Sequence, residues 1–314
     1  MLAEIIITPW HWAGFILLVL LFLALDLGVF NRKAHVVRVK EALCWTTLWF
    51  CLSMAFAGLI FRLHSPEKAV LFVTGYIVEL SLSMDNVFVI ALIFRYFQVP
   101  TTQQHRVLFW GILGALVMRG ILIYLGAELV AQFSWLLYLL GAFLIFTGIK
   151  MIFANSEGIE PEKNPVVKLA RKLFPVTPTF QGQQFITRWQ GRLALTPLAI
   201  VLLMVETTDL VFALDSIPAI FGITQDSFII FTSNIFAILG LRSLYFVLAG
   251  AIEYFTYLKF GLSAVLVFIG GKMVAKFWHL ELPTNLSLAI VAGILLGSIV
   301  ASVLLARLRK KKSV

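Results

Sequence analysis

The sequence is poor in charged residues, which make up 13% of its 314 residues, whereas 61% are hydrophobic. A soluble domain has about 25% charged residues. This composition excludes a soluble globular domain and predicts an all-α integral membrane protein. The 25 Lys and Arg residues outnumber the 16 Asp and Glu residues, but they form no extended basic stripe. We therefore expect the lipid bilayer as a partner, and no nucleic acid.

Cysteine and histidine are also scarce, which excludes several kinds of site. Cys44 and Cys51 are two helical turns apart, too far for a disulfide. The five histidines fall near the ends of apolar segments, and no Cys/His spacing typical of zinc occurs. The sequence lacks a nucleophile–His–acid set, an HExxH motif and a glycine-rich phosphate loop. We predict that the protein is not an enzyme and holds no permanent cofactor.

Apolar runs of about 20 residues, long enough to cross a bilayer, recur nine times. They lie near residues 9–30, 42–63, 69–95, 107–127, 135–153, 194–221, 228–250, 257–277 and 284–306. With the N-terminus outside, the inner connections carry nineteen Lys and Arg residues and the outer ones four. This asymmetry predicts an outer N-terminus and a cytoplasmic C-terminus.

One long polar stretch divides the spans. It contains four prolines and a short amphipathic segment near residues 166–174, which we expect on the membrane surface. The predicted organisation is two spans at 1–68, a first three-helix repeat at 69–153, a cytoplasmic linker at 154–193, a second three-helix repeat at 194–277, and a last span with a basic tail at 278–314.

Two acidic motifs of the same spacing lie inside the apolar spans. They read Glu79-Leu-Ser-Leu-Ser-Met-Asp85-Asn86 and Asp209-Leu-Val-Phe-Ala-Leu-Asp215-Ser216, the second with Glu206 three residues before it. A carboxylate at the centre of a membrane helix costs roughly 2.5–3.5 kcal/mol. Buried ionisable groups in membrane proteins usually mark an ion or proton path.

Further landmarks follow each acidic motif in the same order. An arginine, Arg119 or Arg242, comes first, and a Gly-x-Lys-Met sequence closes each triplet. Three helices per repeat is an odd number, so the second repeat must run opposite to the first. Inverted repeats place a site near the bilayer midplane. We predict that spans 3–5 superpose on spans 6–8 after a rotation of about 180°, with Asp85 and Asp215 near the axis.

The motif side chains offer only oxygen, which suits hard divalent cations such as Mn²⁺, Mg²⁺ and Ca²⁺. The predicted metal ligands are Glu79, Asp85, Asn86, Glu206, Asp209, Asp215 and Ser216. Arg119 and Arg242 are predicted to support the site by holding carboxylates in place with their planar forks. Arg242→Lys should therefore weaken transport substantially.

The spacing within each motif adds a constraint. Side chains six residues apart in a straight helix differ by about 240° and rise about 9 Å. One ion shared by Glu79 and Asp85 therefore needs a break in the helix, for which Pro218 and the serines and threonines nearby are candidates. The alternatives to an ion site are a structural salt-bridge network and a proton relay.

Three segments, residues 78–89, 205–221 and 233–246, resemble the TerC/Alx family of bacterial integral membrane proteins. The family is linked by name to tellurium resistance. The branch most similar to this sequence is associated with manganese homeostasis and export, with expression tied to alkaline pH. The resemblance implies Mn²⁺ export across the bacterial inner membrane. Proton coupling is consistent with it, because protonation weakens a carboxylate's hold on a metal. A membrane scaffold or a metal-loading partner for secreted proteins is the alternative.

Overall fold

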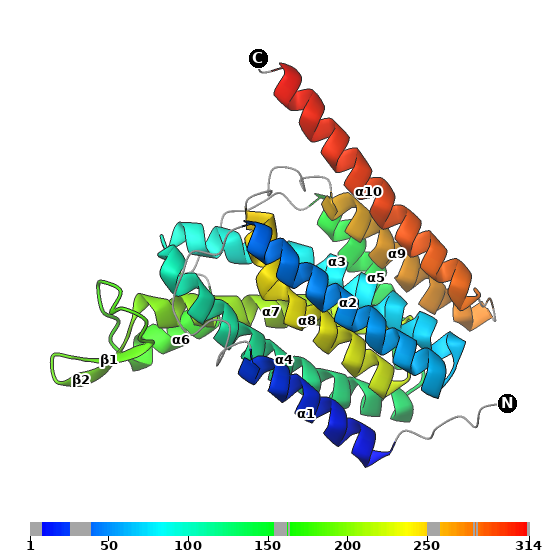
Figure 1. Cartoon of the computed structure of the whole chain (residues 1–314), viewed down its shortest axis with the longest axis horizontal. Coiled ribbons are helices and arrows are strands. Elements are labelled where there is room, and N and C mark those ends of the chain that lie inside the picture. The colour runs from blue at the N-terminus through cyan, green and yellow to red at the C-terminus, as the bar shows by residue number, and fades with distance from the viewer. Residues whose placement is uncertain are drawn as a thin grey trace.

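The computed structural model describes residues 8–25, 39–153, 164–249, 258–278 and 282–312, together with Glu162 and Leu280. The described chain is almost entirely α-helical (Figure 1). Its long helices are α1 Pro9–Leu25, α2 Val39–Leu63, α3 Pro66–Tyr96, α4 Thr101–Gln132, α5 Leu136–Phe153, α7 Pro197–Phe221, α8 Ser227–Ala249, α9 Leu258–Ala275 and α10 Thr284–Lys312. A short 3₁₀ turn, Lys276–Trp278, follows α9.

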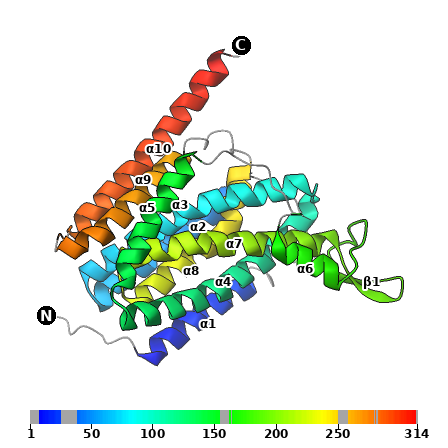
Figure 2. The ribbon, with the colours of Figure 1, turned by 180° about the vertical axis from the view of Figure 1, so that it is seen from behind.

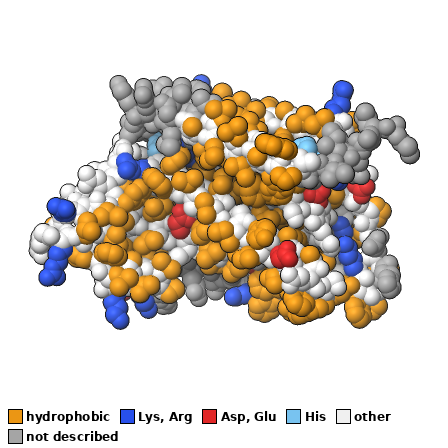
Figure 3. Space-filling view, turned by 90° about the horizontal axis from the view of Figure 1, so that it is seen from below, with side chains coloured by type: hydrophobic (Ala, Val, Ile, Leu, Met, Phe, Trp, Pro, Cys, Tyr) orange, Lys and Arg blue, Asp and Glu red, His pale blue; other side chains and the backbone are white. Residues whose placement is uncertain are grey.

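The all-α membrane fold is confirmed. Among the described residues, eight helices are long and apolar enough to cross a membrane, and α1 is a shorter apolar helix. These nine helices correspond to the nine predicted spans, although residues 26–30 of the first span, residue 250 of the seventh and residue 257 of the eighth lie outside the described residues. Figure 3 shows hydrophobic side chains over most of one face, with Lys and Arg mainly towards its margins. Large apolar side chains such as Ile121 and Val211 are more than half exposed, as expected of a surface that contacts lipid.

The polar linker contains more structure than the sequence indicated. The predicted amphipathic stretch is helix α6, Pro165–Leu173. A hairpin of two four-residue strands, β1 Ile186–Trp189 and β2 Arg192–Leu195, follows it and was not predicted. Gln190 and Gly191 form its turn with positive φ angles of 50° and 73°, the geometry that favours two-residue hairpins.

Three helices begin in the same way, with a polar capping residue followed by proline. The pairs are Ser65-Pro66 at α3, Asn164-Pro165 at α6 and Thr196-Pro197 at α7. The cap's side-chain oxygen accepts a hydrogen bond from a backbone N–H of the first turn. Proline suits the next position, because the N–H that it lacks would have no partner there. These caps fix the starts of the two helices that carry the acidic motifs.

Helices α3, α4, α7 and α8 form the core, in which α3 and α4 each contact both α7 and α8. Helices α5 and α9 pack against each other beside this core, α2 covers α3 and α8, and α10 covers α9. The contacts within this core, and that of α5 with α9, stay the same when α3 is exchanged with α7, α4 with α8, and α5 with α9. Figures 1 and 2 show that α3 ends, and α7 begins, on the side of the hairpin, so the two run in opposite directions. These features fit two inverted triplets, and the superposition itself stays a prediction.

The contact between α5 and α9 is a seam in which glycines bring the two backbones close together. A Cβ atom on Gly270 would lie 2.5 Å from the carbonyl oxygen of Gly141. About two turns along, the Ser263 hydroxyl of α9 donates a hydrogen bond to the carbonyl oxygen of Gly148. Small residues of this kind let the backbones of membrane helices approach closely.

Candidate ion-binding site

Arg119 of α4 lies in the middle of the four-helix core and is only 1% exposed. Its guanidinium forms an ion pair with Glu79 of α3. It also binds Asp209 of α7 at two points, with 3.1 Å from Nη2 to Oδ1 and 3.4 Å from Nε to Oδ2. This is the two-point contact that a planar guanidinium makes with a carboxylate. Arg119 therefore joins one acid from each motif.

Neutral polar side chains complete this arrangement. Arg119 Nη1 lies 3.3 Å from both Ser216 Oγ and Asn234 Oδ1. The Asn234 amide nitrogen donates to the Ile230 carbonyl, which leaves its oxygen for Arg119. Asn86 Nδ2 donates to Asp209 Oδ1 at 2.6 Å. We call this set the central cluster: Glu79, Asn86, Arg119, Asp209, Ser216 and Asn234, all at most 5% exposed.

A glycine next to the central cluster brings its helices together. Gly75 lies one turn before Glu79 on α3, and a Cβ there would come within 2.9 Å of Ser233 Oγ on α8. Ser233 directly precedes Asn234. The lack of a side chain at Gly75 therefore lets α3 approach α8 at the level where Glu79 and Asn234 both reach Arg119.

Glu206 occupies a second place, on the side of α7 that faces α4. Its carboxylate lies directly against Gly114, where any Cβ atom would overlap it. Glu206 is half-buried, and Asp209 is close enough to act on it electrostatically, as the three-residue spacing predicted. The next residue, Thr207, accepts a 2.8 Å hydrogen bond from Asn164 at the start of α6. The linker helix is therefore attached to α7 beside Glu206.

Asp85 and Asp215 occupy a third kind of place, and we call them the flanking pair. Both are half-buried and neither takes part in the hydrogen bonds of the central cluster. The charge of Lys259, at the start of α9, acts on Asp85, and that of Lys150, near the end of α5, acts on Asp215. The flanking pair therefore lies outside the central cluster, where the charges that act on it are those of lysines.

The structure corrects two sequence-based expectations about geometry. The helix break that one ion shared within a motif would need is absent, because α3 and α7 are continuous helices. The acids that meet at the centre are Glu79 and Asp209, and not Asp85 and Asp215. In the described part of the chain, no three Asp, Glu, His or Cys side chains come together as a group that could hold a metal. The five acids occupy three places, and their role as metal ligands stays a prediction.

The two arginines also differ in position. Arg119 is the cation of the central cluster, whereas Arg242 is half-buried and lies two turns beyond Asn234 on α8. Asn234 is the one member of the central cluster that the sequence did not assign. The available signal was an amide side chain in an apolar span, inside the segment that carried the family resemblance.

A small internal cavity adjoins the central cluster. Asn86 and Asp209 line it together with Ile90, Leu108, Gly111, Ile112, Ala115, Val205, Ile238 and Leu241. Asn86 Oδ1 is buried and has no hydrogen-bond partner within the described residues. A buried oxygen without a donor is costly. Asn86, which lines this cavity beside the Asp209 carboxylate, therefore has an acceptor available for a further hydrogen bond.

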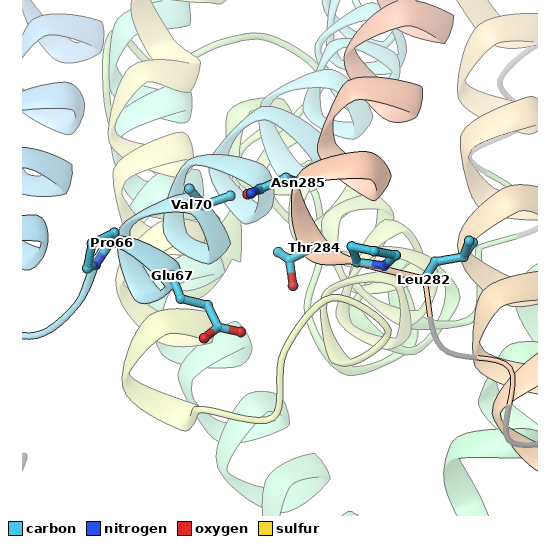
Figure 4. A pocket seen from close by; sticks show the side chains of 7 residues that line it. Pro66, Glu67, Val70, Leu282, Thr284 and Asn285 are labelled. Carbon is cyan, nitrogen blue, oxygen red and sulfur yellow. The ribbon is translucent and has the colours of Figure 1, made fainter.

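A larger pocket lies elsewhere, between the starts of α3 and α10 (Figure 4). Its lining is Pro66, Glu67, Val70, Leu282, Pro283, Thr284 and Asn285. Glu67 is the one carboxylate among these residues, and none of them belongs to either acidic motif. The chemistry of the acidic motifs is therefore found in the core and not in this surface pocket.

Comparison with known proteins decides the family. Residues 64–313 match the family described as "Integral membrane protein TerC family". This chain belongs to the TerC family. It is 53% identical over 300 residues to "Uncharacterized membrane protein STKORF319" of Myxococcus xanthus, covering 96% of this chain and 94% of that one. No solved structure matches it.

Other relatives in this family carry a functional name. The chain is 44% identical over 315 residues to the Salmonella typhi protein "Putative membrane-bound redox modulator Alx", with 97% of each chain covered. It is 45% identical over 298 residues to the Escherichia coli K12 protein of that name, with 92% of each covered. The resemblance to the TerC/Alx family is thus confirmed, and the protein is a multi-pass integral membrane protein.

Proposed function

We propose that this TerC family protein is a carrier, not an enzyme, that exports a divalent cation, Mn²⁺, across the bacterial inner membrane, with its N-terminus outside. The observation that carries the proposal is the central cluster. It brings two carboxylates, one from each motif, together in the core beside amide and hydroxyl oxygens. Because carboxylates are costly inside a membrane, such a pair is expected to serve an ion path. A set of ligands made only of oxygen atoms binds Mn²⁺ better than it binds a soft metal.

The three acidic places suggest a route for the ion. Asp85 and Asp215 lie six residues from Glu79 and Asp209 respectively, about 9 Å along helices that run in opposite directions. The flanking pair therefore lies on either side of the central cluster along the helix axes. We propose that each flanking acid receives or releases the ion at one side, with Glu206 beside the centre. Proton antiport would follow if protonation of these acids releases the metal.

The test is Mn²⁺ flux in proteoliposomes that contain the purified full chain and a fluorophore quenched by Mn²⁺. We expect flux from the wild type and at least a tenfold loss in Glu79→Gln and in Asp209→Asn. Glu128→Gln is the matched control, because Glu128 is an exposed acid on α4 that accepts a hydrogen bond from Gln132. Wild-type flux no greater than that of empty liposomes would reject the transport proposal.

One observation favours a second candidate function. The central cluster is already hydrogen-bonded internally through Arg119, as a purely structural network would be. In that case the protein is a scaffold or a metal-loading partner, and its acids hold the fold together. This candidate predicts no Mn²⁺ flux from the wild type, together with loss of folding in the Glu79 and Asp209 variants.

A further inference from the structure

The guanidinium of Arg119 is placed as a bound cation would be. Its partners among the described residues are all oxygens: carboxylates of Glu79 and Asp209, the hydroxyl of Ser216 and the amide oxygen of Asn234. These partners come from α3, α7 and α8, whereas Arg119 is on α4. The oxygens that the proposed function assigns to a metal are therefore the ones that Arg119 already occupies.

Charge makes these two occupants mutually exclusive. A guanidinium keeps its proton in proteins, so Arg119 stays positive and the two carboxylates leave the central cluster with one net negative charge. A divalent cation placed between the same carboxylates would lie within a few ångströms of Arg119, in a site where burial strengthens their repulsion. Binding of the metal therefore requires that the guanidinium leave at least one carboxylate.

The core contains an acceptor towards which the guanidinium can move. Side chains of a helix extend towards its N-terminus, which for Arg119 is the direction of Ala115 and Gly111. Both line the small cavity that also contains Asn86, and Asn86 Oδ1 has no donor among the described residues. Positions 111 and 115 carry no large side chain, but Val205 Cγ1 of α7 packs beside Gly111, so the guanidinium reaches Asn86 when Val205 moves aside.

We propose that Arg119 is a tethered counter-cation, which fills the central cluster when no metal is bound and is displaced by the metal. This inference rests on the proposed transport function. It adds a source of positive charge for the central carboxylates when no metal is bound. With Arg119 in place, the metal-free site is compensated and the empty carrier can change its orientation. Without Arg119, only metal or protons neutralise the acids, so at a pH that keeps them ionised the carrier can change orientation only when loaded.

The test compares Arg119→Gln and Arg119→Lys with the wild type, using full-length protein. Mn²⁺ binding is measured by titration calorimetry in detergent, and net efflux and Mn²⁺/Mn²⁺ exchange are measured in proteoliposomes. We expect Arg119→Gln to bind Mn²⁺ at least tenfold more tightly, to retain exchange, and to lose net efflux at least tenfold. Arg119→Lys keeps a tethered positive charge, so it should retain part of the net efflux. A purely positioning role for Arg119 would lower exchange and efflux together.

A second pair of variants covers the case in which Arg119→Gln does not fold. Glu79→Gln/Arg119→Gln removes one charge of each sign and keeps the net charge of the cluster. We expect it to bind Mn²⁺ at least tenfold more tightly than Glu79→Gln alone. Equal or weaker binding in this comparison, or in folded Arg119→Gln, would overturn the proposal. If neither the wild type nor any variant binds or moves Mn²⁺, the transport function itself fails, which is a different result.

Discussion

The central cluster and the flanking pair use the same acidic motifs in different ways. Each motif gives one acid to the centre and one to the flank, since six residues turn a helix by about 240°. At the centre, Glu79 and Asp209 are buried and held by the fork of one arginine. At the flank, Asp85 and Asp215 are half-buried, and the charges that act on them are those of Lys259 and Lys150. A planar guanidinium fixes geometry, whereas a lysine supplies charge on a flexible stem. The comparison suggests that the central cluster is a rigid binding site and that Asp85 and Asp215, on either side of it, are more adaptable.

The largest effect is expected from breaking the centre. Asp209→Asn removes the carboxylate that Arg119 holds at two points and that accepts from Asn86. Loss of one partner of a buried ion pair typically costs about 3–5 kcal/mol. We expect a markedly lower melting temperature in detergent and no manganese tolerance in cells. Asp226→Asn is the control, because Asp226 pairs with Lys68 near a helix end, where both are partly exposed. Equal melting temperatures for the two variants would show that the centre contributes no special stability.

A smaller structural effect and a clear functional one are expected at the flank. Asp85→Ala and Asp215→Ala remove half-buried charges outside the central hydrogen bonds. They should leave membrane insertion and the melting temperature near those of the wild type, because removing a costly charge does not impair insertion. Manganese tolerance should be lost. Normal Mn²⁺ efflux by well-expressed Asp85→Ala and Asp215→Ala proteins would remove the flanking pair from the route.

The smallest effect is expected at the second arginine. The sequence suggested equal importance for Arg119 and Arg242, but Arg119 alone holds the two central acids. We therefore expect Arg242→Lys to reduce Mn²⁺ efflux by less than threefold, and Arg119→Lys to reduce it by more. The ratio of efflux rates, normalised to protein in the liposomes, measures the difference. A greater loss of efflux in Arg242→Lys than in Arg119→Lys would show that the planar guanidinium is needed more at Arg242, on α8, than at Arg119.

The spans could be predicted because crossing a bilayer requires only an apolar run of sufficient length. Helical periodicity also predicted that Glu79 and Asp85 point apart in a straight helix. Helix α3 is continuous over both residues, so this prediction applies. The meeting of Glu79 with Asp209 could not be predicted, because it depends on how α3 and α7 are rotated against α4. Asn234 was missed for a related reason: a single amide in an apolar helix has no periodic pattern. The hairpin was missed because four-residue strands give too few alternations to read.

The seam between α5 and α9 has a consequence for how the protein is made. The two helices are separated by about 100 residues of chain, so at ~5–20 residues per second α9 is synthesised roughly 5–20 s after α5. Throughout this interval, Gly141 and Gly148 have no α9 backbone to contact. The seam therefore forms between helices that enter the bilayer at different times, as in a two-stage pathway of insertion followed by association. A newly made first repeat must therefore remain in the membrane without its partner until the second repeat is complete.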